Sequence, residues 1–171
     1  MAPTKSLKSI NPVQLAAQNE QIQGQLPLVD CERLVPLLRE NTGSIDFSLQ
    51  FMQDESQRAI VQLSLAVVLM LECRRCLQPF SQQFKVDVNL AVIGNVEAAE
   101  GLPECYEPLL VTDGVVALES LIEDELLLNL PVMPGHSDKE CPVALPENWM
   151  SNELEERKNP FGVLKKLLRS D

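Results

Sequence analysis

The chain has 171 residues, of which 45% are hydrophobic, and its 25 acidic residues against 14 lysines and arginines give a net charge of −11 at pH 7. This length and composition are compatible with one folded domain that buries a substantial core. The negative charge argues against a general nucleic-acid binder, whose affinity depends on neutralising phosphates. It favours a basic partner, although acidity also simply keeps a protein soluble.

The charge is unevenly distributed along the chain. Residues 157–171 contain five basic residues and one acidic residue, a net charge of +4, so residues 1–156 carry −15. We therefore expect a single α+β domain over residues 1–156 and a short basic C-terminal tail over residues 157–171. An isolated helix as short as this tail is marginal in water. The tail is expected to be mobile until it docks on a partner or on the acidic body, and Lys165, Lys166 and Arg169 are its candidate partner-binding and RNA-contacting residues.

The number of cysteines and the length of the apolar runs indicate the cellular compartment in which the protein is expected. Five cysteines at irregular spacing do not form a disulfide framework, so a reducing compartment is expected. No apolar segment follows the basic N-terminus, which argues against a secretory signal. The longest apolar run, residues 65–71, is far below the ~18 residues that a membrane span needs. These features predict a cytoplasmic protein that does not span a membrane.

Helical signals come first along the chain, followed by strand signals. Asn11 and Pro12 predict the start of one helix, and Asp30 could cap a second helix over residues 30–40, although a proline at position 36 falls late for a first turn. After residue 44, apolar and polar residues alternate over residues 45–51, 61–71 and 84–92. Three consecutive alternating runs joined by short turns predict an antiparallel β-meander with one face packed against helices.

The second half of the chain predicts a loop, a strand and a helix. Residues 94–105 have the composition of an acidic, mobile loop, and a short fourth strand is expected at residues 107–112. Residues 117–130 are expected to form a helix, because four large apolar side chains share one of its faces. Beyond two prolines that end this helix, the chain is rich in proline and acidic residues to position 156.

The predicted helix carries the densest group of carboxylates in the chain, which comprises Glu119, Glu123, Asp124 and Glu125. Paired carboxylates can perform acid–base chemistry or hold magnesium in a ribonuclease. No neighbouring histidine, lysine or nucleophile completes a mechanism, so the sequence favours a solvated helix face, with Glu119, Glu123 and Asp124 turned to water.

The most informative motif is the pair Cys73 and Cys76, placed at a turn between two alternating runs. Two thiolates at this spacing can bind one metal ion, and His136 and Cys141 are a candidate second pair. Four such ligands would make a closed structural zinc site. A redox dithiol of the thioredoxin type needs a helix that begins beside the motif, whereas here a strand pattern follows. Two ordinary reduced cysteines at a hairpin end remain the simpler alternative.

Arg74 and Arg75, between the two cysteines, are the only adjacent basic residues in the acidic body. They are candidates for contact with a phosphate or with a carboxylate of a partner. Surface arginines are, however, more often only solvated.

Four ordered blocks of this sequence resemble one bacterial family. They are the segment of residues 71–80 around Cys73-Arg-Arg-Cys, residues 102–108, residues 121–136 from Leu-Ile-Glu-Asp-Glu to Pro-Gly-His, and residues 159–164, Asn-Pro-Phe-Gly-Val-Leu. Together they are similar to the YceD-like family of large ribosomal RNA subunit accumulation proteins, over most of the chain.

This resemblance implies a non-enzymatic factor in ribosome biogenesis that supports the synthesis, processing or stability of large-subunit (23S) ribosomal RNA in the cytoplasm. Its expected partners are ribosomal precursor particles and a basic ribosomal protein or biogenesis factor. Family members often carry further cysteines after the Leu-Pro-x-x-Pro segment, and here those positions correspond to His136 and Cys141. A metal-dependent ribonuclease that uses the carboxylates from Glu119 to Glu125 is the alternative function, and a thiol redox factor is a third.

Overall fold

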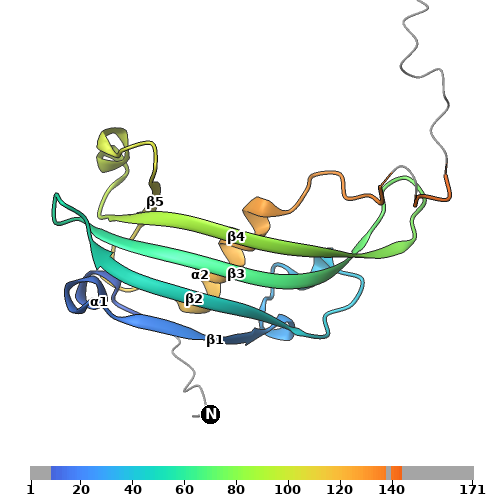
Figure 1. Ribbon diagram of the computed structural model, residues 1–171, viewed down its shortest axis with the longest axis horizontal. Helices are drawn as coiled ribbons and strands as arrows, with labels where there is room; N and C mark the ends of the chain where they lie inside the picture. Colours follow the sequence, from blue (N-terminus) through green and yellow to red (C-terminus); the bar gives the residue numbers. More distant parts are fainter. Residues whose placement is uncertain (1–8, 138–139, 144–171) are drawn as a thin grey trace, which may run out of the picture.

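The computed structural model describes residues 9–137 and 140–143 (Figure 1). A short helix α1 (Pro12–Gln18) precedes strands β1 (Gln21–Pro27), β2 (Ser44–Gln53), β3 (Ala59–Glu72), β4 (Pro79–Ile93) and β5 (Glu107–Leu110), and helix α2 (Leu118–Asn129) follows them. The helix predicted from Asn11 and Pro12 is confirmed, because the Asn11 side chain accepts a hydrogen bond from the Gln14 N–H at 3.0 Å and Pro12 lies in the first turn.

The five strands form one sheet in the order β1-β2-β3-β4-β5. Strands β1 to β4 are antiparallel neighbours, and β5 joins the edge parallel to β4. The predicted meander and the short fourth strand are therefore confirmed, and the fold is α+β. Strand β1 was not predicted, because only Ile22, Gly24 and Leu26 alternate with glutamines there and the apolar pattern is weak.

One face of the sheet makes the core. Leu49 of β2, Leu63 and Leu69 of β3, and Ile122 and Leu126 of α2 are all fully buried. Helix α2 lies across this face (Figure 1), which confirms the predicted packing of helix against meander. The alternation of each strand therefore fixes which side chains meet α2.

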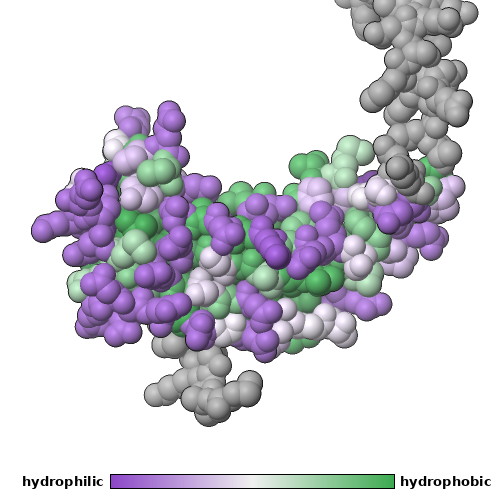
Figure 2. Space-filling model, viewed as in Figure 1, coloured by the Kyte–Doolittle hydropathy of each residue, from purple (hydrophilic) through white to green (hydrophobic). Residues whose placement is uncertain are grey.

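The other face is open to solvent and mostly polar. It carries the intervening residues of the central strands, namely Asp46, Ser48, Gln50, Gln62, Ser64, Gln83, Lys85, Asp87 and Asn89. Figure 1 looks onto this face, and among the described residues no helix crosses it. In Figure 2 the same face shows hydrophilic side chains with hydrophobic areas between them. We call this surface the open face.

The predicted helix over residues 30–40 is wrong. The structure has two single 3-10 turns there, Leu28–Asp30 and Val35–Leu37. Pro36 lacks the N–H that a continuing helix would use. The backbone N–H groups of Arg33 and Leu34 instead donate to the carboxylate of Glu123 on α2, at 2.7 and 3.0 Å. A long-range contact thus replaces the local helix.

The segment over residues 94–105 also has more structure than the sequence predicted. A 3-10 helix spans Val96–Gly101, and the Asn95 side chain caps it by accepting from the Ala98 N–H at 3.0 Å. The sequence did not indicate this helix, because a 3-10 helix this short has no apolar periodicity and the acidic composition of the segment is typical of a loop.

The predicted tail over residues 157–171, with Lys165, Lys166 and Arg169, lies outside the described residues, as does the domain boundary at residue 156. Both stay predictions. In the part of the chain that the structure describes, no helix has the length and apolar character needed to cross a membrane.

Candidate metal centre and neighbouring surfaces

The turn between β3 and β4 positions the first two candidate ligands. The ladder closes with Glu72 opposite Pro79, so six residues form the connection. The Cys73 N–H donates to the Gln78 carbonyl at 3.0 Å, and the Leu77 N–H donates to the Cys73 carbonyl at 2.9 Å. Leu77 adopts a left-handed conformation with φ +59°, which lets the chain reverse into β4. The turn therefore presents Cys73 and Cys76 together at the end of the sheet.

The segment after α2 brings the second pair to this turn. The Arg74 N–H donates to the Pro134 carbonyl at 2.9 Å, and the Arg75 guanidinium donates to the His136 carbonyl at 2.6 Å. The His136 ring packs against Phe80 of β4, with ring centroids 4.9 Å apart. These contacts hold residues 134–136 against the β3–β4 turn.

The four predicted ligands come together in the structure. The sulfur atoms of Cys73, Cys76 and Cys141 and a ring nitrogen of His136 all lie within 4.8 Å of one another. The Cys76 sulfur is 3.5 Å from His136 Nδ1, and Cys73 and Cys141 are buried. Thiolates bound to one zinc at ~2.3 Å in a tetrahedron lie roughly 3.8 Å apart. The donor set and its spacing therefore fit a closed metal site, which we call the Cys/His cluster.

The thiols of the Cys/His cluster differ in acidity. Burial opposes ionisation of Cys73, but hydrogen bonds from backbone N–H groups of Cys76, His136 and Arg75, with the His136 side chain, outweigh it and lower the Cys73 pKa to about 5. Burial and the neighbouring thiols Cys73 and Cys141 raise the Cys76 pKa. Cys73 therefore ionises before Cys76, and metals bind the ionised form of a thiol.

The two arginines of the motif have different environments. Arg75 is half-buried and contributes its guanidinium to the loop that carries His136, so it stabilises the cluster from outside. Arg74 is exposed, and only its backbone takes part in the turn. Contact of either arginine with a partner stays a prediction.

Of the three carboxylates that the sequence places in solvent, only Asp124 is exposed; Glu119 is half-buried, and the prediction is wrong for Glu123. Glu123 is buried, and its two oxygens accept from the backbone N–H groups of Arg33 and Leu34 and from Arg33 Nε at 2.8 Å. Burial alone would raise the Glu123 pKa, but these hydrogen bonds lower it below its ordinary value. Arg33 also pairs with the exposed Asp124 at 2.6 Å. No signal in the sequence links Arg33 to a glutamate 90 positions away.

Glu125 has the opposite environment from Glu123. It is also buried, and burial together with the charges of Glu107 and Asp124 raises its pKa. Glu119 is half-buried one turn before Glu123. Glu123 and Asp124 thus meet at Arg33, Glu125 is buried apart from that ion pair, and among the described residues the four carboxylates do not gather into a group that could hold a metal ion.

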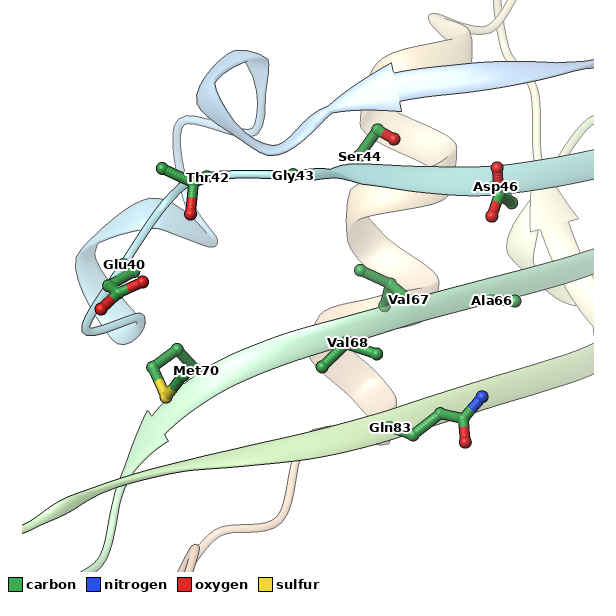
Figure 3. Close-up of a pocket in the computed structure, with 10 residues that line it drawn as sticks. All are labelled: Glu40, Thr42, Gly43, Ser44, Asp46, Ala66, Val67, Val68, Met70 and Gln83. Carbon is green, nitrogen blue, oxygen red and sulfur yellow. The ribbon is translucent and has the colours of Figure 1, made fainter.

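The open face has a cavity of about 430 Å³ near the end of β3. In Figure 3, Asp46, Val68 and Gln83 project into it from three adjacent strands, while Glu40 and Thr42 come from the segment before β2. Val68 is 58% exposed. The cavity therefore combines an apolar floor with carboxylates at its edge, which suits a lysine or arginine side chain of a partner.

Similarity to known proteins covers nearly the whole chain. The family model described as large ribosomal RNA subunit accumulation protein YceD matches residues 61–168, a range that includes all four residues of the Cys/His cluster. The large ribosomal RNA subunit accumulation protein YceD of Haemophilus influenzae is 29% identical over an alignment of 171 positions, which covers 98% of each chain. No solved structure matches this chain.

We expect Glu123→Gln to destabilise the protein by about 1–3 kcal/mol at pH 7, because an amide cannot satisfy three donors that are partly buried. Since the folded-state pKa of Glu123 is lowered, its stabilisation is present above the ordinary glutamate pKa of ~4.3 and is lost as the pH falls. Urea denaturation at pH 7 and pH 4 measures both effects. Asp124→Asn is the matched control, with an expected change below about 0.5 kcal/mol.

Glu125→Gln should have the opposite effect on stability and raise the free energy of unfolding at pH 7. Its raised pKa means that the folded state favours the protonated acid, so this stabilisation is lost as the pH rises. The variant should equal the wild type in stability near pH 4 and exceed it at pH 7. A variant less stable than the wild type at pH 7 would show that the ionised carboxylate has a favourable partner.

Proposed function

The chain belongs to the YceD family of large ribosomal RNA subunit accumulation proteins, and we propose that it supports the accumulation of large-subunit ribosomal RNA as a non-enzymatic factor in ribosome biogenesis. The observation that carries this proposal is similarity over 98% of both chains to a relative that bears this name. Because ribosomal RNA is made and assembled in the bacterial cytoplasm, we place the protein there.

The surroundings of the carboxylates support binding rather than catalysis. A magnesium-dependent ribonuclease would need the carboxylates between Glu119 and Glu125 open and directed at one ion. Glu123 instead accepts hydrogen bonds from the Arg33 side chain and from the backbone N–H groups of Arg33 and Leu34, between the two 3-10 turns, and Glu125 is buried with a raised pKa. No specific observation favours the ribonuclease alternative.

We assign zinc to the Cys/His cluster. Three thiols and one imidazole are the donors that zinc prefers, and four protein ligands leave no open position, as in structural zinc sites. Cys73 and Cys76 belong to the β3–β4 turn, while His136 and Cys141 belong to the segment after α2. A shared ion would therefore join two parts of the fold that only a few hydrogen bonds connect.

The open face is the surface that we propose for the basic partner. Glu40 and Asp46 edge the apolar floor around Val68, and Asp87 lies further along the same face. These features complement the cationic, amphipathic segments of a ribosomal protein or another biogenesis factor. Within precursor particles, the basic residues of the tail would contact RNA.

Protein purified under reducing conditions should contain about one zinc per chain. Cys73→Ser should lose the metal and lower the melting temperature by several degrees, because loss of a structural metal removes binding energy from the folded state. Cys105→Ser is the matched control, since Cys105 is exposed and lies outside the cluster. Metal-free protein that melts at the same temperature with and without chelator would contradict this assignment.

Charge reversal on the open face should weaken association with large-subunit precursor particles. We expect Glu40→Lys combined with Asp46→Lys to release the protein at lower salt in sedimentation assays, because two attractive charges become repulsive. Glu97→Lys combined with Glu100→Lys, at two exposed positions of the 3-10 helix beyond β4, makes the same change in net charge and is the matched control. Equal sedimentation of both variants would exclude the open face as the docking surface.

A strain that lacks the gene should show a lower ratio of large-subunit to small-subunit ribosomal RNA. Quantitative RNA analysis during rapid growth and in the cold measures this ratio. The proposal fails if the ratio and the level of precursor RNA are the same as in the parent strain under both conditions.

A further inference from the structure

A second cavity, of about 400 Å³, lies at the end of the sheet beside the Cys/His cluster. Three segments line it, namely residues 36–39, residues 71–74 at the end of β3, and residues 130–134 after α2. Arg74 and Pro134 belong both to its wall and to the hydrogen bond that holds the cluster loop. We call this cavity the end groove.

The end groove exposes more apolar surface than a solvated loop region requires. Val132 is 95% exposed and Leu37 is 53% exposed, and both line it together with Leu38, Leu71 and Leu130. Apolar surface gathered in a concave site marks a place where another segment binds.

The rim of the end groove is basic. Arg39 forms an ion pair with Glu72, and both residues line the groove. Arg74 is exposed at the rim, and among the described residues no carboxylate forms an ion pair with it. A segment that combines apolar side chains with carboxylates would therefore fit the groove better than the basic residues 157–171.

Such a segment follows immediately in the chain. Residues 145–156 contain Leu145, Trp149, Met150 and Leu154 together with four glutamates, and Trp149 is the only tryptophan of the protein. Trp149 is eight residues beyond Cys141, an extended reach of up to about 28 Å. Cys141 is a member of the cluster that borders the groove, so the tether is long enough.

We propose that the end groove binds the protein's own residues 145–156, with Trp149 against the apolar wall of Leu37 and Val132 and the glutamates toward Arg74. Bound in this way, the segment covers the exposed apolar residues beside the Cys/His cluster. The basic residues 157–171 would then begin near the end of the sheet that carries the Cys/His cluster. This inference does not rest on the role in ribosomal RNA accumulation or on zinc.

Trp149 fluorescence in the full-length protein tests the proposal directly, because no other tryptophan contributes. We expect a blue-shifted emission and low acrylamide quenching in the native protein, at all protein concentrations. Val132→Glu and Leu37→Glu should each shift the emission to the red and raise quenching toward that of the urea-unfolded chain. Val96→Glu is the control, since Val96 is 68% exposed and lies in the 3-10 helix beyond β4. Circular dichroism checks that each variant remains folded.

Four results would overturn the proposal. A native emission equal to that of the unfolded chain would mean that Trp149 is not bound. A blue shift that appears only at high protein concentration would mean that a second copy fills the groove. A blue shift that appears only when precursor particles are added would assign the groove to an external partner. A blue shift that survives both groove substitutions would place Trp149 elsewhere on the protein.

Discussion

Strands β3 and β4 pair from Ile60 opposite Ala91 to Glu72 opposite Pro79, and this ladder determines which side chains can meet. Because side chains alternate between faces, a slip of one residue would turn the buried leucines of β3 to solvent, so burial fixes the register. The same register ends the ladder at Pro79 and leaves the turn that carries Cys73 and Cys76 at one end of the sheet. The position of the Cys/His cluster thus follows from the burial of β3.

Helix α2 connects the core to the cluster. Leu126 and Ile122 bury its apolar face against the sheet, and Glu123 binds Arg33 in the segment between the two 3-10 turns. The helix ends at Asn129, after which the chain reaches the β3–β4 turn through the hydrogen bond from Arg74 to Pro134. A metal ion bound by both the β3–β4 turn and the segment after α2 would hold these two segments together. It would therefore stabilise the end groove and the Cys/His cluster at the same time.

The sequence predicted the elements whose evidence is local. The alternation of β3 and β4, the apolar face of α2 and the cap at Asn11 all depend on neighbouring residues, and each was identified correctly. The spacing of Cys73 and Cys76 also indicated a shared site, and the fold brings His136 and Cys141 to it. The cluster could be predicted because both ligand types are scarce in this chain, which has five cysteines and one histidine.

The errors arose where a distant contact overrides local preference. Residues 30–40 have the composition of a helix, but Pro36 interrupts it and Glu123 takes the N–H groups of Arg33 and Leu34. For the same reason Glu123 was placed in solvent, because helical periodicity cannot show which polar residue meets a partner from another part of the chain. Strand β1 depends on pairing with β2 rather than on its own pattern.

We propose that the protein supports large-subunit ribosomal RNA through a fold held together at the Cys/His cluster. The most direct measurement is the ratio of large-subunit to small-subunit ribosomal RNA in a strain that lacks the gene and carries wild-type, Cys141→Ser or Cys105→Ser protein at equal expression. We expect the wild type and Cys105→Ser to restore the ratio and Cys141→Ser to fail to restore it. Full restoration by Cys141→Ser would contradict this proposal.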